Sequence, residues 1–579
     1  MTFTAPTKDQ LFALETATDI SELSRHERFG EADADLVQAI VEGVGQFAEG
    51  EFAPLNRVGD EVGAKLVDGR VVMPEGFKQA YKGYVEAGWN SLCATPDHGG
   101  QGLPFALATV SLDSLGAANM AFTLCPMLSV GAIEALEHHG SEEQKERYLP
   151  KLISGEWPGT MNLTEPQAGS DVGALRTTAT PLGDGKYQIK GQKIYITFGD
   201  HDMADNIIHL VLARTPDAPP GTKGISLFLV PKYQLNDDGT PGKEQDIETV
   251  SIEHKLGIHA SPTCVLQYGE RGECIGELIG GEFGGIRAMF TMMNNARLNV
   301  GLQGVEIAER ATQQALHYAQ ERVQSARAGG DSRDPVAIVE HPDVRRMLLR
   351  MKAGTEAARA LLYFAAGQVD RATLGVDGAQ EKVDILTPLA KGYGTDLGIE
   401  IASLGVQIHG GMGFVEETGA AQHYRDARIM PIYEGTNGIQ AADLVGRKLA
   451  MRGGEAMKEF LDELRDIAGN EAHVAELVAA CQEVTNWMLN ASVDERLAGS
   501  YAYMTMMAVA TSGALMAKQH RVAQERVDSG EGDSAFCKAK LVTTRYYCDH
   551  MVPEALGLKA SAMGGADLLY ALSAEELAA

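Results

Sequence analysis

The most informative stretch of this sequence is Met430-Pro-Ile-Tyr-Glu-Gly-Thr-Asn-Gly-Ile-Gln440, which places the carboxylate of Glu434 in a turn without any other charge. The nearest basic residue is Arg428, and Gly435 follows the glutamate directly. Partial desolvation in such a turn would raise the pKa of a carboxyl group towards the range useful for a general base. Gly435 would let a ligand approach the backbone closely, and the neighbouring amides could donate to a developing oxyanion. The alternative interpretation is a plain loop-to-helix turn in which Thr436 caps the next helix.

A second motif lies earlier in the chain, at Met161-Asn-Leu-Thr-Glu-Pro-Gln-Ala-Gly-Ser-Asp-Val-Gly173. Together the two segments resemble the acyl-CoA dehydrogenase family, which is known for the patterns TEPxAGSD and YEGTxxIQ. Further segments match the family in the same order: Gly191-Gln-Lys-Ile-Tyr-Ile-Thr197, Lys255-Leu-Gly-Ile-His-Ala-Ser-Pro-Thr263, Asn294-Asn-Ala-Arg297, Arg322-Val-Gln324 and Gln407-Ile-His-Gly-Gly-Met-Gly-Phe414. The resemblance covers roughly residues 36–445, which leaves the final 134 residues (579 minus 445) to be explained separately.

Size and composition indicate a globular protein with several domains. A chain of 579 residues is too long for one ordinary core, so about two to four domains are expected. Lys and Arg number 50 against 79 Asp and Glu, which gives a formal net charge of −29. This charge disfavours nucleic acid and acidic membranes as partners. A site for FAD or coenzyme A must therefore be locally basic, and Arg297 and Arg322 are the candidates.

Cysteine usage, the N-terminus and the apolar segments favour the cytoplasm. The seven cysteines are scattered without metal-ligand spacing, so free buried thiols are expected and no metal site. Met1–Glu31 is polar with mixed charge and predicts no signal peptide. Leu497–Ala517 runs 21 residues without a charge, which is long enough to span a bilayer. Because glycine, serine and threonine dilute its hydrophobicity, we interpret it as a buried helix and expect no membrane span.

The pattern of the sequence changes along the chain and divides it into five parts. Helical periodicity predicts helices before residue 158 and again after Gly284-Gly285, whereas the part between them contains short runs typical of strands, such as Lys186–Thr197 and Thr263–Tyr268. We expect the α+β fold of the family, with one further helical domain at the C-terminus. The expected parts are an N-terminal extension (1–35), an N-terminal helical domain (36–157), a middle β-barrel-like domain (158–283), a C-terminal helical bundle (284–445) and an additional helical domain (446–579).

The resemblance implies removal of two hydrogens across the Cα–Cβ bond of an acyl-CoA thioester, to give the trans-2-enoyl-CoA. It assigns Glu434 as the base that takes the α-proton. FAD N5 would accept the β-hydride, because protein side chains offer no hydride acceptor. The Glu434 N–H and a flavin ribityl hydroxyl would hold the enolate-like oxygen. Some members of the family place the base one residue before the family's arginine, but this position is Ala296 here.

The resemblance also implies which residues bind FAD and coenzyme A. The cofactor residues are Met161, Leu163, Thr164, Gly169, Ser170, Tyr195, Thr197, Arg322, Gln324, Gln407, Gly410, Gly411 and Thr436, and the substrate residues are Ser170, Asn294, Arg297 and Gly435. Arg322, Gln324 and Gln407–Gly411 match residues that reach the FAD of a neighbouring subunit, so a homo-oligomer is expected, with a homodimer preferred. Tyr195 stands where the family usually has Trp, and Ser325-Ala326 where it often has Phe-Gly.

Three functional alternatives follow. The first is an FAD-dependent acyl-CoA dehydrogenase of β-oxidation type that passes electrons to an electron-transfer flavoprotein. An acyl-CoA oxidase would use the same fold and base but return the electrons to oxygen, and a catalytically silent homologue would serve as a scaffold. Long family members include enzymes for long-chain acyl-CoAs and for short substrates such as 3-(methylthio)propanoyl-CoA. A short or medium acyl-CoA is preferred here.

Overall fold

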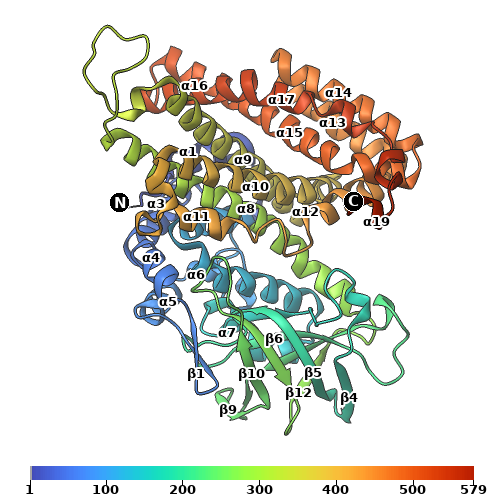
Figure 1. Cartoon of the computed structure of the whole chain (residues 1–579). Helices are drawn as coiled ribbons and strands as arrows, with labels where there is room; N and C mark the ends of the chain where they lie inside the picture. Colours follow the sequence, from blue (N-terminus) through green and yellow to red (C-terminus); the bar gives the residue numbers. More distant parts are fainter. Residues whose placement is uncertain (1–2) are drawn as a thin grey trace. The chain divides into compact units, whose positions relative to one another are not determined.

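Two compact units make up the protein. The computed structural model describes residues 3–579, apart from the side chains of Met292 and Asn294. One unit contains Pro6–Glu42 and Arg297–Ala579, and the other contains Gly43–Ala296. Along the chain, helices precede and follow a β domain, and further helices complete the C-terminus (Figure 1). This order confirms the α+β fold expected from the sequence.

The Gly43–Ala296 unit combines helices with one large sheet. Its main helices are α4 (Ala53–Val62), α5 (Phe77–Glu86), α6 (Phe105–His139) and α7 (Glu142–Ser154). The sheet has the strand order β10-β11-β5-β12-β7-β6-β3, with β4 paired to β5, and only the β3–β6 pair is parallel among its described strands. Its strands are β3 (Gly159–Asn162), β4 (Thr178–Gly183), β5 (Lys186–Thr197), β6 (Ile208–Ala213), β7 (Ser226–Pro231), β10 (Ile247–Ile252), β11 (Thr263–Tyr268) and β12 (Ile275–Ile279). The short strands β1 (Lys65–Val67) and β2 (Arg70–Val72) pair with each other, as do β8 (Tyr233–Leu235) and β9 (Pro241–Glu244).

A bulge in β5 distorts the sheet beside a predicted site residue. The register with β11 shifts between Cys264, which faces Ile196, and Leu266, which faces Lys193. The extra residue on β5 falls next to Tyr195, whose backbone has a φ of 60°. Bulges of this kind re-aim side chains, and Tyr195 is 60% exposed although its neighbour Ile196 is buried.

The larger unit is a helical bundle with an N-terminal segment packed onto it. The N-terminal helices are α1 (Thr7–Ala13), α2 (Ile20–Leu23) and the part of α3 (Ala34–Phe47) up to Glu42. The bundle contains α8 (Gly285–Glu321) from Arg297 onward, α9 (Pro342–Thr373), α10 (Ala379–His409), α11 (Ala420–Ala427) and α12 (Asn437–Asp443). The backbones of α8 and α10 approach so closely that a Cβ at Gly304 would meet the carbonyl oxygen of Gly394 at 1.8 Å. Glycine is therefore required at this crossing.

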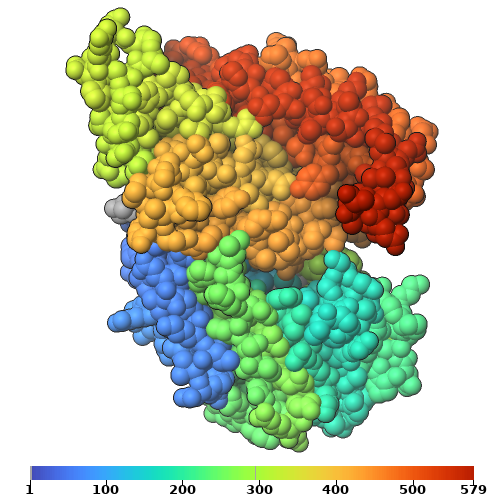
Figure 2. Space-filling model, viewed as in Figure 1, coloured from blue at the N-terminus to red at the C-terminus, as the bar shows by residue number. Residues whose placement is uncertain are grey.

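The C-terminal domain adds further helices to this bundle. They are α13 (Glu455–Ala468), α14 (Ala472–Asn490), α15 (Val493–Ser529), α16 (Ser534–Tyr546), α17 (Val552–Leu556), α18 (Lys559–Ala562) and α19 (Ala574–Leu577). Residues 506–517 of α15 are all buried, in agreement with the interpretation of the uncharged segment as a core helix. The last residues, dark red in Figure 2, lie on the surface of the domain, and Leu568 is 89% exposed.

Among the described helices, α6 is long and apolar enough to cross a bilayer, but 94% of its apolar stretch is buried inside the protein. Such burial is typical of a core helix.

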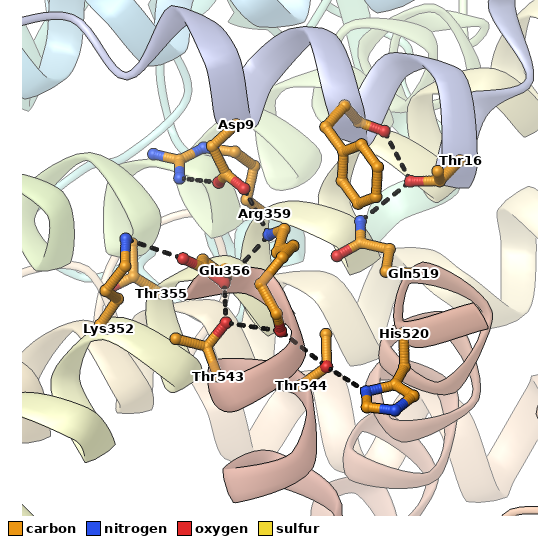
Figure 3. Close-up of polar contacts among 12 residues, drawn as sticks. Asp9, Thr16, Lys352, Thr355, Glu356, Arg359, Gln519, His520, Thr543 and Thr544 are labelled. Atoms are coloured by element: carbon orange, nitrogen blue, oxygen red, sulfur yellow. Dashed lines mark hydrogen bonds and ion pairs between the residues drawn. The ribbon is translucent and has the colours of Figure 1, made fainter. Parts of the chain in front are cut away.

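A buried ionic network joins the N-terminal segment, the bundle and the C-terminal domain (Figure 3). Asp9 on α1 accepts from Arg359 on α9 at 2.6 Å and also binds Lys540 on α16. Lys540 in turn donates to Glu356 at 3.0 Å, and Thr543 donates to the same carboxylate at 2.5 Å. Buried ion pairs of this kind are specific in geometry, because each charge must meet its partner away from water.

Candidate functional site

The predicted base lies in the turn between α11 and α12. Glu434 has a φ of 54° and Gly435 a φ of 82°, so two successive residues adopt the left-handed conformation. For a glutamate this conformation costs about 1–3 kcal/mol, and such strain persists only where neighbouring groups enforce it. Gln440 enforces it here, because its Nε2 donates to the carbonyls of Glu434 at 3.3 Å and Gly435 at 3.4 Å. Thr436 caps α12 by accepting from the Ile439 N–H at 3.2 Å.

The environment of Glu434 suits a general base. Burial raises the pKa of Glu434 above its usual range, and the charges of Arg297 and Lys391 offset only part of this effect. When the pKa of the carboxyl group is raised, it lies closer to the pKa of the carbon acid that the carboxylate must deprotonate. Both interpretations of the turn are compatible in the structure, since Thr436 is a helix cap and Glu434 is at the same time half-buried and perturbed.

Arg297 and Gln440 present buried polar atoms beside this turn. An added Cβ at Gly435 would lie 3.9 Å from a terminal guanidinium nitrogen of Arg297, so the arginine lies beside this turn. Burial lowers the pKa of Arg297, while the charges of Asp443 and Glu434 raise it. Within the described residues, Arg297 Nε and Gln440 Oε1 are buried without a hydrogen-bond partner. Orphaned groups of this kind fit a polar ligand, as expected for a residue that contacts the acyl thioester.

Lys391 is a site residue that the sequence did not reveal. Its side chain is fully buried in α10, and its Nζ donates to Asn437 Oδ1 at 2.7 Å. Burial lowers the pKa of Lys391 to about 8, against the opposing charges of Asp396 and Glu434. In the sequence, Lys391 could have been noticed as an isolated charge inside the otherwise uncharged run Ile385–Thr395.

The residues predicted to hold the flavin ring gather where β3 ends beside β5. The amide of Ile194 donates to the Thr164 carbonyl at 2.9 Å, which places Thr164 next to Tyr195. Lys193 Nζ donates to the Leu163 carbonyl at 3.0 Å. Met161 is buried in β3, whereas Leu163 and Thr164, just after β3, and Thr197, at the end of β5, are half-buried. Gly169 and Ser170 follow in an exposed loop.

The glutamate of the first motif has a structural role that sequence reasoning missed. Glu165 forms a fully buried ion pair with Lys193 at 2.8 Å and also accepts from the amides of Arg176 and Thr177. Burial alone would raise the pKa of Glu165, but Lys193 and these hydrogen bonds lower it to about 2. The pair thus fixes the loop that carries Ser170 against β5.

A third group lies at one end of the bundle. The rings of Tyr318 and His409 stack with centroids 4.4 Å apart, which joins the C-terminal ends of α8 and α10. This contact brings the segment of Arg322 and Gln324 to that of Gln407, Gly410 and Gly411, and all five residues are exposed. Open space surrounds both glycines, because a Cβ added to either would meet nothing within 4 Å.

These groups have the features that FAD requires. An isoalloxazine ring needs an aromatic or apolar face with polar groups at its edge. The exposed ring of Tyr195 and the half-buried hydroxyl-bearing residues Thr164 and Thr197 provide such a surface. Arg322 supplies an exposed cation for a phosphate or nucleotide group. The residues present therefore fit the cofactor.

Other predictions concern Asn294, His259 and metal ions. The side chain of Asn294 lies outside the described part of the structure, so its role stays a prediction. His259 contacts Asp60 at 3.0 Å and the carbonyl of Lys255 at 3.1 Å, which is a local structural role. Among the described residues, no cluster of three or more His, Cys, Asp or Glu side chains could hold a metal ion.

Comparisons with known proteins identify the family of this chain. Four family models match: acyl-CoA dehydrogenase N-terminal domain at residues 35–156, middle domain at 160–270, C-terminal domain at 284–450, and acetyl-CoA dehydrogenase C-terminal like at 454–573. The chain is 45% identical to 3-methylmercaptopropionyl-CoA dehydrogenase of Ruegeria pomeroyi, over 96% of this chain and 97% of the relative. It is 37% identical to butyryl-CoA dehydrogenase of Syntrophomonas wolfei, over 97% of each chain.

A solved structure shares the fold. It is described as the electron transferring flavoprotein of Acidaminococcus fermentans, is 28% identical, and superposes with a TM-score of 0.59 over 70% of this chain and 96% of its own. The chain belongs to the acyl-CoA dehydrogenase family and is an FAD-dependent enzyme of that family.

Proposed function

We propose that this protein oxidises a short acyl-CoA to its trans-2-enoyl-CoA with Glu434 as the base, and that 3-(methylthio)propanoyl-CoA is its substrate. The observation that carries the proposal is the half-buried Glu434 in a left-handed turn, with a raised pKa and Arg297 beside it. Identity of 45% with a 3-methylmercaptopropionyl-CoA dehydrogenase along nearly the whole chain supports the substrate.

The chain's own groups account for the proton and the developing charge. Glu434 takes the α-proton as the Cα–H bond breaks, and the amide of Glu434 donates to the thioester oxygen as negative charge develops there. FAD, when bound, supplies the acceptor for the hydride that leaves Cβ. Proton and hydride together account for the two hydrogens lost. Arg297 and Gly435 bind the acyl thioester beside the base, and Asn294 and Ser170 are the further substrate residues.

The remaining predicted residues bind the cofactor in this proposal. The middle-domain group (Met161, Leu163, Thr164, Gly169, Ser170, Tyr195 and Thr197) holds the ring and pyrophosphate, and Thr436 contacts the nucleotide. Arg322, Gln324, Gln407, Gly410 and Gly411 reach the FAD of a second copy in a cytoplasmic homodimer. Their exposure at one end of the bundle supports this role. In this proposal an electron-transfer flavoprotein reoxidises the enzyme, as the family resemblance implies.

The test compares the wild type with Glu434→Gln under anaerobic conditions. With 3-(methylthio)propanoyl-CoA the wild type should bleach its flavin, and the variant should bind FAD and thioester but bleach at least about a hundredfold more slowly. Butanoyl-CoA and palmitoyl-CoA complete the panel, and a faster reaction with palmitoyl-CoA would reject the short substrate. Rapid aerobic turnover with peroxide release would reject the dehydrogenase in favour of an oxidase.

A further inference from the structure

A chain of hydrogen bonds links the C-terminal domain to the turn that carries Glu434. It begins at Tyr501 on α15, whose hydroxyl donates to Asp396 Oδ2 at 2.5 Å. The other carboxylate oxygen of Asp396 accepts from Asn437 Nδ2 at 2.9 Å. Asn437 is the first residue of α12 and stands three positions after Glu434. The side chains of Tyr501 and Asp396 therefore connect α15 to the start of α12, the helix that follows Glu434.

Asn437 is fixed more firmly than a helix-start residue requires. Its amide Nδ2 also donates to the Gly392 carbonyl at 3.1 Å, and its Oδ1 accepts from Lys391 at 2.7 Å. Its backbone N–H donates to the Pro431 carbonyl at 3.0 Å, across the turn. A carboxylate on one side and an ammonium on the other leave the amide a single orientation, because a flip would set like groups against each other.

Lys391 gives this arrangement an electrostatic role. The ammonium is buried in α10, and Asn437 holds it at hydrogen-bond distance. Its charge acts on Glu434 and lowers the pKa of that carboxyl, which burial raises. A displaced ammonium would therefore leave the base more often protonated and inactive.

We propose that Tyr501 and Asp396 are positioning residues for the base: they fix Asn437, which in turn fixes the Lys391 ammonium and the turn of Glu434. The C-terminal domain then takes part in setting up the active site, in addition to covering the bundle. The inference rests on the proposed role of Glu434.

The experiment measures proton abstraction directly. A 3-thia-acyl-CoA carries sulfur at the β position and has no hydride to lose, so its exchange of α-hydrogen for solvent deuterium reports the base alone. In the FAD-loaded enzyme, Tyr501→Phe should slow this exchange about ten- to a hundredfold, the size expected for a misplaced catalytic group. The dissociation constant of the thioester should stay unchanged. Asp396→Asn should act in the same direction.

A matched control lies two residues along the same helix. Tyr503 is buried and hydrogen-bonds Thr485 at 2.6 Å, so Tyr503→Phe also removes one hydroxyl from α15 and should leave exchange unchanged. Equal exchange rates in the wild type, Tyr501→Phe and Asp396→Asn would overturn the inference, provided that Glu434→Gln abolishes exchange. Retained exchange in Glu434→Gln would instead reject the proposed base.

Discussion

Arg359 donates to Asp9 at 2.6 Å, so a central helix of the bundle forms a buried ion pair with the first helix of the chain. Burial alone would raise the pKa of Asp9, but the charges of Lys540 and Arg359 outweigh it and hold the pKa well below its usual range. The folded-state pKa is thus lower than the unfolded one. This carboxylate stabilises the fold above about pH 4, and its contribution is lost as the pH falls further.

We expect Asp9→Asn to lower the free energy of unfolding by about 3–5 kcal/mol at pH 7, because buried cations lose their partner. The difference from the wild type should shrink as the pH falls below about 4, because Asp9 then binds a proton in the unfolded wild-type chain. Urea unfolding at several pH values measures both effects. Lys8→Ala is the control, since Lys8 forms an exposed pair with Asp533 that is worth at most about 1 kcal/mol. Equal losses in the two variants would contradict the prediction.

The raised pKa of Glu434 predicts a pH dependence of flavin reduction. Only the ionised carboxylate can take the α-proton, so the rate should fall as the pH drops through a value above the ordinary 4.5. Arg297 lowers this pKa, and Arg297→Gln should therefore move the acid limb to higher pH. Stopped-flow reduction at saturating acyl-CoA gives the profile for each protein. An unchanged acid limb in Arg297→Gln would show that the arginine does not act on the base.

Much of the fold was predictable because it depends on local patterns. The expected strands Lys186–Thr197 and Thr263–Tyr268 are β5 and β11 with the same bounds, since alternation between turns marks a half-buried strand. Glu434 and Gly435 stood out because one charge sat in an uncharged turn. The strands β3 and β12 were not predicted, because short runs such as Gly159–Asn162 carry no alternation of their own.

The partners of the site depend on contacts that no local pattern encodes. Lys391 and Asn437 are 46 positions apart and Tyr501 and Asp396 are 105 apart, yet both pairs hydrogen-bond. The pairing of Glu165 with Lys193 likewise requires β3 and β5 to lie together. Single side chains of this kind look ordinary in the sequence until the helices and strands are packed.

Tyr195 offers a prediction about cofactor affinity. The residue is 60% exposed at the bulge of β5, and it stands where the family usually has Trp. Tyr195→Trp should tighten FAD binding by about 0.5–1 kcal/mol through the larger stacking area, and Tyr195→Ala should weaken it. Fluorescence titration of the apoprotein with FAD measures the change. Tyr424→Ala removes an exposed tyrosine elsewhere and should have no effect. Equal affinities in all variants would reject contact of Tyr195 with the flavin.

The apolar contact between the C-terminal domain and the bundle leads to a prediction about the assembly state. Helix α15 of this domain covers apolar parts of the bundle: a Cβ at Gly392 on α10 would come within 2.4 Å of the Met504 methyl group. Removal of residues 450–579 would expose this surface, and burial of apolar area is worth about 25 cal/mol per Å² to whichever partner covers it. We expect the full-length protein to be a homodimer and the truncated protein to form tetramers or aggregates.

Sedimentation equilibrium on both proteins tests this assignment. Tyr501→Phe in the full-length chain is the control, because it removes one hydrogen bond to Asp396 while the apolar side of α15 stays in place, so the dimer should persist.

The Met504 contact gives a sharper variant. Met504→Asp would bury an unpaired carboxylate against α10 and should loosen the domain, since an isolated charge is very costly to desolvate. A full-length protein that is already tetrameric would show that α15 does not replace a second interface between copies. A truncated protein that remains a clean dimer would show that the surface beneath α15 needs no cover.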